Sequence, residues 1–131
     1  MGHLQERGII YGVLNSDKIF INPADHTVKL LDPSATATDP LMICEGRLYS
    51  PEILNDEEEI DMFKSDMFVA GLIILECGLL VNLSQETEPD LTDYMNMFRN
   101  GQGEECEGYS DKLCNMVEWM LEAEPEKRPT F

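Results

Sequence analysis

The stretch from Ser65 to Val81 reads SDMFVAGLIILECGLLV, and it decides the fold. Wound at about 3.6 residues per turn, its apolar side chains surround the helix axis instead of following one stripe. Such a helix has to be covered on every side. The run is interrupted by Glu76 and is shorter than the ~20 apolar residues that cross a bilayer. We therefore predict a buried central helix with an N-cap at Ser65-Asp66 and an end near Leu80 or Val81.

Two further helices are predicted after the central one. Apolar residues between Leu91 and Phe98 indicate an amphipathic helix that opens near Pro89 and closes at Gly101. Another helix is expected from about Ser110 to Glu122. Its apolar residues recur at helical spacing and are Leu113, Met116, Val117, Met120 and Leu121.

Short extended segments precede the central helix. Ile19–Ile21 and Val28–Leu31 flank a run of turn residues, which is the pattern of a β-hairpin. Residues 32–52 show no periodicity and are expected to form a long irregular loop, with one helical turn at Glu52–Leu54 and an exposed acidic run after it. The predicted fold is mainly α, and residues 1–131 make one domain or part of one, with a small hairpin and helices packed around one buried helix.

Acidic side chains dominate the composition. The chain has 26 Asp and Glu against 9 Lys and Arg, which gives a formal net charge of -17. With no basic patch to neutralise phosphates, nucleic acid is excluded as a partner. The acids are expected mainly to solvate loops and helix faces, and attraction of a basic partner surface is the alternative.

The cysteines give an expectation about the compartment. Cys44, Cys77, Cys106 and Cys114 lie too far apart for a Cys-x-x-Cys metal or redox motif. No signal-peptide pattern opens the sequence. We therefore expect reduced thiols in an intracellular, cytoplasmic protein that does not enter the membrane.

Five motif-like signals occur in a fixed order along nearly the whole chain. His3–Ile10 is similar to the end of the helix before the protein kinase catalytic loop, and Tyr11–Lys18 stands where that loop has His-Arg-Asp-Leu-x-x-x-Asn. Val28–Ser34 stands where a strand leads into Asp-Phe-Gly, and Tyr49–Glu52 is similar to the Ala-Pro-Glu that ends the activation segment. The fifth signal has two parts: Ser65–Gly71 is similar to Ser-Asp-x-Trp-x-x-Gly, and Glu124–Phe131 is similar to Asp-Pro-x-x-Arg-Pro-Thr. Together they resemble the C-terminal lobe of eukaryotic protein kinases.

The resemblance implies a catalytic centre whose reactive residues have been replaced. In protein kinases an Asp accepts the substrate proton, while an Asn and a second Asp hold magnesium. Here the base position is Val13, which has no lone pair, and the Asn position is Lys18, whose ammonium repels Mg²⁺. Asp32 keeps the second Asp position, although Pro33 constrains its backbone and a turn or capping role is the alternative. No catalytic residue is expected, and Asp32 is a weak candidate for cofactor or metal binding.

Residues that hold the kinase fold together match the family better than the catalytic positions do. By the resemblance, Glu52 pairs with Arg128 and ties the activation segment to the helices, while Asp66 accepts hydrogen bonds from the backbone of Tyr11–Val13. The alternatives are an ordinary surface ion pair and an ordinary N-cap. Residues 32–52 then form a degenerate activation segment.

The kinase phosphate loop and strand Lys belong to an N-terminal lobe that would precede residue 1. No cofactor is therefore expected to bind this chain alone. The main hypothesis is a catalytically inactive pseudokinase fragment that acts as a binding or scaffold module for a protein partner. An alternative is part of a serine/threonine-type protein kinase that, once completed by an N-terminal lobe, uses ATP and Mg²⁺ for weak phosphoryl transfer.

A third hypothesis is a truncated product without an independent role. Because only the last residues of the helix before the catalytic loop are represented, one apolar flank of the helix at Met67–Val81 would be left uncovered. An exposed apolar flank is either a partner site or an aggregation liability.

Overall fold

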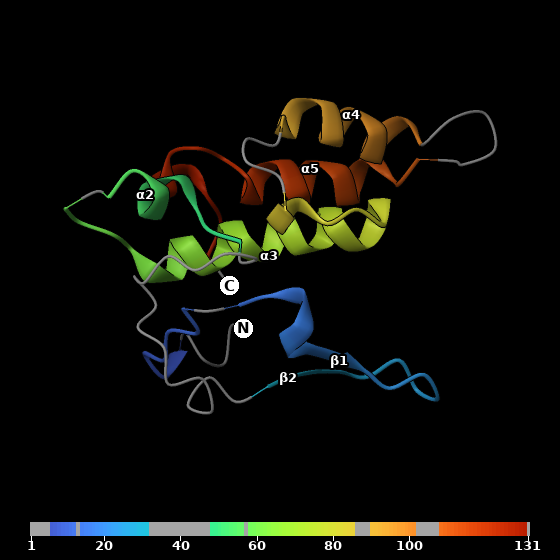
Figure 1. Ribbon diagram of the computed structural model, residues 1–131, viewed down its shortest axis with the longest axis horizontal. Coiled ribbons are helices and arrows are strands. Elements are labelled where there is room, and N and C mark those ends of the chain that lie inside the picture. The colour runs from blue at the N-terminus through green and yellow to red at the C-terminus, as the bar shows by residue number, and fades with distance from the viewer. Residues whose placement is uncertain are drawn as a thin grey trace.

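The computed structural model describes residues 6–12, 14–31, 48–56, 58–85, 90–101 and 108–130. Its elements in chain order are the 3-10 helix η1 (Ser16–Lys18), β1 (Ile19–Ile21), β2 (Val28–Leu30), α2 (Pro51–Leu54), α3 (Met62–Leu79), η3 (Leu83–Gln85), α4 (Leu91–Asn100), α5 (Asp111–Met120) and η4 (Pro125–Lys127). Figure 1 shows α4 and α5 on one side of α3 and the β-hairpin on the other. The prediction of a mainly helical fold with a small hairpin is confirmed.

The central helix α3 is covered around most of its circumference, as the sequence predicts. Its buried apolar side chains point in several directions and are Met67, Phe68, Val69, Leu72, Ile73, Leu75 and Leu79. Helices α4 and α5 both contact it, and segments from the N-terminal part of the chain cover other faces. Burial of these side chains is the main source of stability in the fold, because the hydrophobic effect scales with apolar area removed from water.

The predicted start of this helix is wrong. The carboxylate of Asp61 accepts hydrogen bonds from backbone N–H groups of the first turn, so α3 begins at Met62. Ser65-Asp66 therefore lies inside the helix and is buried. At the other end, Leu80 has a left-handed conformation with φ of 55°, which stops the helix at Leu79, and its side chain is 91% exposed.

Helix α4 follows the prediction closely. The carboxylate of Asp90 caps its first turn, and the backbone N–H of Gly101 closes its last one. Met95 and Phe98 form its buried face. The amphipathic pattern therefore predicted both the helix and the side that packs.

Helix α5 differs from its prediction in detail. It begins after a cap at Ser110, as expected, but it ends at Met120 instead of Glu122. Met116, assigned to the apolar face, is 43% exposed, whereas Cys114 is fully buried. The buried face runs through Cys114, Val117 and Met120, so it is rotated relative to the predicted stripe.

Helices α3 and α4 approach each other closely at Gly78. A Cβ at this position would lie 2.3 Å from Cε2 of Phe98. The Phe98 ring stacks on Tyr109 with ring centroids 4.3 Å apart, and the Tyr109 hydroxyl donates a hydrogen bond of 3.0 Å to the Gly78 carbonyl. The missing side chain at Gly78 is what lets the two aromatic rings pack here.

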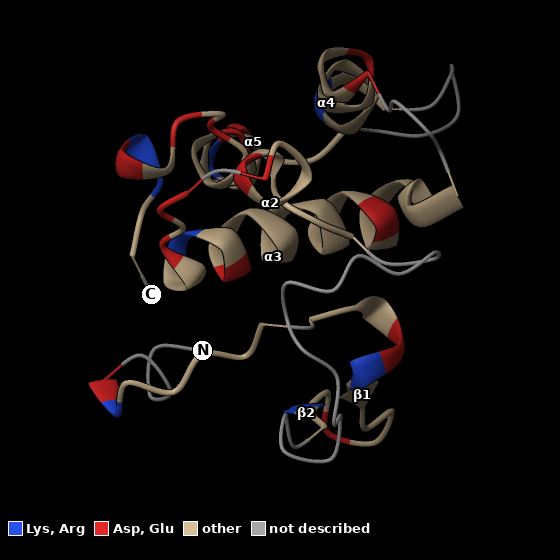
Figure 2. Cartoon of the chain, turned by 60° about the vertical axis from the view of Figure 1, so that its left-hand side comes forward, with Lys and Arg blue, Asp and Glu red and all other residues tan. Residues whose placement is uncertain are grey.

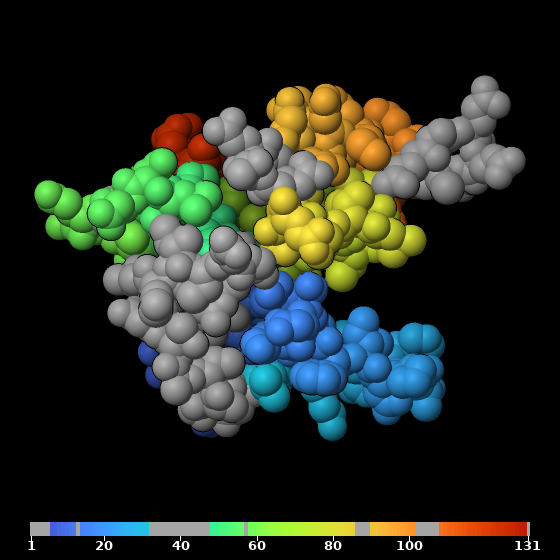
Figure 3. All heavy atoms as spheres, viewed as in Figure 1, coloured from blue at the N-terminus to red at the C-terminus, as the bar shows by residue number. Residues whose placement is uncertain are grey.

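The predicted hairpin is present. Strands β1 and β2 are antiparallel, with Ile19 opposite Leu30. These two residues pack on the core, but neither strand contains a buried residue, and Phe20 is 55% exposed. Figure 3 shows the hairpin projecting beneath the end of α3 with open space between them.

The segment before α3 is described in part. The predicted helical turn after Pro51 is present as α2. Residues 32–47 of the predicted irregular loop lie outside the described residues. The acidic run after α2 is exposed where it is described, at Asn55, Asp56, Glu58, Glu59 and Asp61. Among the described helices, none is both long enough and apolar enough to cross a membrane.

Candidate functional site

A buried ion pair joins α2 to the end of the chain. Nη1 of Arg128 lies 2.7 Å from Oε1 of Glu52, and Nη2 lies 2.8 Å from Oε2, so the guanidinium donates two parallel hydrogen bonds to the carboxylate. The two side chains are 0% and 1% exposed. The structure therefore brings Glu52 and Arg128 together in the interior, which excludes the alternative of an ordinary surface ion pair.

The other donors of Arg128 bind backbone carbonyls. Nε donates to Glu122 at 2.6 Å, Nη1 to Lys64 at 3.0 Å and Nη2 to Ala123 at 2.9 Å. All the N–H donors of the guanidinium are thereby used. The guanidinium also lies 4.7 Å from the centre of the Phe68 ring, within range of a cation–π interaction. One side chain therefore holds α2, α3 and the loop after α5 in a fixed arrangement.

The environment of Glu52 favours its charged form. Burial alone would raise its pKa, but the hydrogen bond from Arg128, the backbone and the nearby positive charge outweigh burial and lower that pKa. The hydroxyl of Ser50, just before α2, lies 2.8 Å from the hydroxyl of Ser65 in α3, and both are buried. This second polar contact fixes α2 on α3 beside the ion pair.

Asp66 attaches the N-terminal segment to α3. Its Oδ2 accepts a hydrogen bond of 2.8 Å from the N–H of Tyr11, and its Oδ1 accepts one of 2.8 Å from the N–H of Gly12. Gly12 has φ of 73°, a conformation that favours glycine. Burial raises the pKa of Asp66, and the two backbone hydrogen bonds oppose that rise. Since α3 starts before this residue, Asp66 is a link between segments and not an N-cap.

Lys18 lies at the end of η1, next to the hairpin. Its Nζ is 3.2 Å from Oδ2 of Asp17. Its carbonyl accepts a hydrogen bond of 2.9 Å from the N–H of Leu31, the residue before Asp32. The hydroxyl of Tyr11 also donates to the Leu31 carbonyl, at 2.7 Å. The structure thus places the backbone of Lys18 beside the strand end at Leu31, while its ammonium group is paired with Asp17.

Two residues of the predicted catalytic centre are not among the residues that the structure describes. Val13 and Asp32 lie outside the described residues, as does the stretch 32–47 of the predicted degenerate activation segment. Of the described residues, no three His, Cys, Asp or Glu side chains are grouped so that they could hold a metal ion. Of the catalytic centre that the kinase resemblance implies, the structure therefore describes Lys18, its partner Asp17 and the backbone around Leu31.

Sequence reasoning missed three polar contacts. Besides the two buried serines, the Nζ of Lys64 donates to the carbonyl of Arg128 and, at 3.4 Å, to that of Pro129. Glu76 accepts a hydrogen bond of 2.9 Å from the N–H of Leu83 and is buried. The signal for Glu76 was visible as a lone acid inside an apolar run, because a buried charge needs a partner. The other contacts depend on which segments meet.

Comparison with known proteins gives one match. Over 88 residues the chain is 34% identical to a Caenorhabditis briggsae protein named membrane-associated tyrosine- and threonine-specific cdc2-inhibitory kinase wee-1.3. The match covers 66% of this chain but only 12% of that protein. No protein-family model matches the chain. The similarity supports a distant relationship to a protein kinase.

Proposed function

We propose that this chain is part of the C-terminal lobe of a protein kinase-like domain that does not transfer phosphate and acts as a binding or scaffold module for another protein. The observation that carries the proposal is Lys18. By the order of the motifs, Lys18 takes the position where the resembled kinases use an Asn to hold magnesium, and its ammonium group is paired with Asp17. A cation cannot replace a metal ligand, because Mg²⁺ is bound by oxygen atoms.

The sequence supports the same conclusion at the base position. Phosphoryl transfer in protein kinases depends on a carboxylate that accepts the proton of the substrate hydroxyl and on metal ions that neutralise the developing charge. Val13 offers no proton acceptor. Asp32 is then the remaining candidate ligand, and one carboxylate alone binds magnesium weakly.

The contacts of Glu52, Arg128 and Asp66 support a scaffold role. The Glu52–Arg128 pair and the hydrogen bonds to Asp66 fix the helices and the N-terminal segment through contacts within this chain. A helical frame that is rigid by itself is suited to present a binding surface, because less conformational entropy is lost when a partner binds. A scaffold role needs only this fixed frame. Catalysis also needs a proton acceptor and a magnesium ligand at the positions of Val13 and Lys18.

Phosphate transfer is the direct test of this proposal. The 131-residue chain is incubated with Mg²⁺, radiolabelled ATP and a general acceptor protein, and we expect no transfer above that of buffer. Asp32→Ala and the exposed-acid control Asp25→Ala should behave like the unchanged chain. Saturable, magnesium-dependent transfer that Asp32→Ala abolishes and Asp25→Ala preserves would contradict the proposal.

A second candidate function is favoured by the match itself. The chain corresponds to 12% of a relative whose name calls it a kinase, so an N-terminal lobe on the same polypeptide could supply a nucleotide site and allow weak ATP-dependent transfer through Asp32. The coding sequence upstream of Met1 discriminates between the two. A Gly-rich strand-turn followed by a strand Lys would favour the kinase, and their absence would remove this candidate.

We place the protein inside the cell. Cys77 and Cys114 are free thiols in the structure, one exposed and one buried, and disulfides in proteins occur mainly in oxidising compartments. Fluorescence microscopy of a tagged chain tests this location, and secretion into the medium would contradict it.

A further inference from the structure

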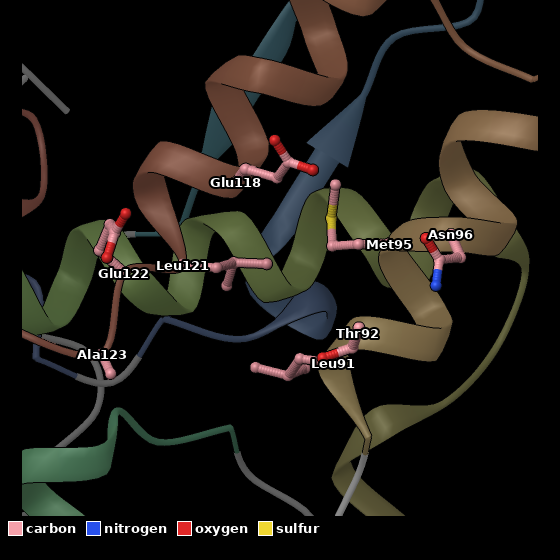
Figure 4. Close-up of a pocket in the computed structure, with 8 residues that line it drawn as sticks. All are labelled: Leu91, Thr92, Met95, Asn96, Glu118, Leu121, Glu122 and Ala123. Carbon is pink, nitrogen blue, oxygen red and sulfur yellow. The ribbon is translucent and has the colours of Figure 1, made fainter.

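A pocket with a volume of about 310 Å³ opens between the beginning of α4 and the end of α5. Figure 4 shows the side chains of Leu91 and Met95 from α4, and of Leu121 directly after α5, lining this pocket. Leu91 and Leu121 are partly buried, and Met95 is buried, so the pocket has a preformed apolar floor. A floor of this kind is suited to an aliphatic side chain.

Two carboxylates line the same pocket as Leu91, Met95 and Leu121. Glu118 and Glu122 lie one helical turn apart and both line the pocket. Nη2 of Arg99 lies 2.8 Å from Oε1 of Glu118, but Nη1 of the same guanidinium is also paired with Asp111 at 3.2 Å. Within the described residues, Glu122 takes part in no ion pair. The pocket edge therefore carries net negative charge.

The surroundings extend this negative charge. A second groove of about 750 Å³ shares Ala123 with the pocket and is lined by the acids Glu59, Asp61, Glu124 and Glu126. Lys127 is paired with Glu124 at 2.5 Å, so that cation is already engaged. Figure 2 shows acidic segments around the loop that follows α5 and at the beginning of α3. A ligand in the pocket would therefore meet acids on both sides.

Charge complementarity decides which occupant fits. Nucleic acids and acidic peptides are repelled, since like charges brought together at an interface are costly. A second copy of this chain is disfavoured for the same reason, because its 26 acids outnumber its 9 basic residues. A basic segment of another protein matches the charged edge, and one aliphatic residue within that segment matches the floor.

We propose that the α4–α5 pocket docks a basic segment of a protein partner. One aliphatic side chain enters between Leu91, Met95 and Leu121, and flanking Arg or Lys residues face Glu118 and Glu122. This assignment rests on the proposed scaffold function, and it specifies that the partner segment is basic and contains an aliphatic residue. The paired charges set specificity and the rate of association, and the buried aliphatic group adds apolar contact.

The test uses a fluorescein-labelled Arg-Arg-Leu-Arg-Arg peptide and the whole chain, with fluorescence anisotropy as the readout. We expect saturable binding at about 0.01 M salt that weakens at about 0.15 M, because the exposed charges are screened. Replacing the peptide leucine by serine, or its arginines by glutamine, should weaken binding about tenfold. A peptide whose leucine is dispensable would overturn the proposal.

Variants of the chain locate the site. Glu118→Gln/Glu122→Gln should weaken binding about tenfold, and Glu122→Gln alone, which leaves the Arg99 pair intact, should weaken it about threefold. The control Asp25→Asn removes one charge, as Glu122→Gln does, from the hairpin turn on the opposite side of α3 and should bind like the unchanged chain. Equal binding by the pocket variants, or an equal loss in the control, would overturn the pocket assignment.

The outcomes separate this inference from the proposed function. A chain that neither transfers phosphate nor binds the peptide rejects the pocket while leaving the non-catalytic proposal standing. Phosphate transfer by a chain that still binds the peptide rejects the non-catalytic proposal alone. Circular dichroism of each variant confirms that the exposed substitutions leave the fold intact.

Discussion

Two regions of the molecule are held together in different ways. The helical frame consists of α2, α3, α4, α5 and the segment after α5, and the hairpin arm consists of residues 14–31. Leu75, Cys114 and Val117 of the helical frame are 0% exposed, and Arg128 uses all its donors inside that frame. The hairpin arm has no buried residue in either strand and follows the segment that Asp66 ties to α3. The residues that the kinase resemblance identifies as structural lie in the tightly held region.

The two regions differ in how much a substitution should cost. Removing one partner of a buried ion pair leaves a charge without compensation, so the frame tolerates little change. Lys18 of the hairpin arm contacts an exposed acid and is itself partly exposed, so its identity has little effect on folding. Substitutions in the hairpin arm are therefore expected to cost less stability than substitutions in the frame.

The largest effect is expected from Arg128→Ala. It would leave the buried Glu52 carboxylate without its guanidinium, at a cost of about 3–5 kcal/mol in the free energy of unfolding. Urea denaturation followed by circular dichroism measures this loss. The control Lys127→Ala removes a neighbouring but exposed cation and should leave the urea midpoint unchanged. Equal midpoints for Arg128→Ala and the unchanged chain would mean that the frame does not depend on the pair.

A smaller loss is expected from Gly78→Ala in α3. Its Cβ would lie 2.3 Å from the buried ring of Phe98, and overpacking of this kind costs about 1–3 kcal/mol. Gly71→Ala is the comparison in the same helix, because its Cβ would lie 3.0 Å from Cδ2 of Leu121 and 3.1 Å from Cβ of Met120, which is milder crowding. We expect the larger drop in melting temperature for Gly78→Ala. Comparable melting temperatures for the two variants would contradict the close packing of α3 on α4.

Asp66→Ala should separate the two regions. Two backbone N–H groups, of Tyr11 and Gly12, would lose their acceptor, at a cost of about 1 kcal/mol because the segment can move into water. Hydrogen exchange should quicken at Tyr11, Gly12 and the hairpin while amides of α5 stay protected. Faster exchange in α5 as well would show that the arm and the frame unfold as one unit.

The pH dependence of stability should come partly from Glu52. Its pKa lies below the ordinary glutamate value of 4.5, so its contribution is present above that value and is lost as pH falls through the lowered pKa. Asp66 has the opposite sign, because its raised pKa makes its contribution largest below 3.8 and smaller as pH rises through the folded value. The difference in unfolding free energy between the unchanged chain and Glu52→Gln should shrink below pH 4.5. A difference that stays constant down to acid unfolding would contradict the charged state of Glu52.

The smallest effect is expected on the hairpin surface. Phe20 and Val28 are 55% and 60% exposed, so Phe20→Ser or Val28→Ser should change the free energy of unfolding by about 0.5 kcal/mol or less. Urea denaturation of both variants measures it. A loss as large as that of Gly78→Ala would mean that the hairpin arm is packed more tightly than its exposure indicates.

Local signals predicted most of the elements. The hairpin, α2, α4 and the central apolar helix follow from turn residues, caps and periodicity, all of which act within a few residues. The start of α3 was mispredicted because Ser65-Asp66 has the composition of an N-cap, while the true cap, Asp61, lies in an acidic run that reads as a linker. The exposed side of α5 at Met116 depends on the rotation of the helix against α3, which no local pattern determines.

The candidate site was predictable only where the family resemblance supplied partners. It indicated that Glu52 pairs with Arg128 and that Asp66 receives backbone hydrogen bonds, although periodicity could not have joined residues so far apart in the chain. The Ser50–Ser65 contact and the carbonyls around Arg128 depend on how α2 and the final segment meet α3. Such contacts arise from tertiary packing, and their residue types have ordinary local explanations.

The central claim is that the frame persists without a working nucleotide site, and nucleotide binding measured by thermal shift tests it most directly. The unchanged chain and Asp32→Ala are each melted with and without millimolar Mg²⁺-ATP. We expect cooperative unfolding of both chains at melting temperatures that the nucleotide leaves unchanged. A magnesium-dependent rise in melting temperature that grows with ATP concentration and disappears in Asp32→Ala would contradict it.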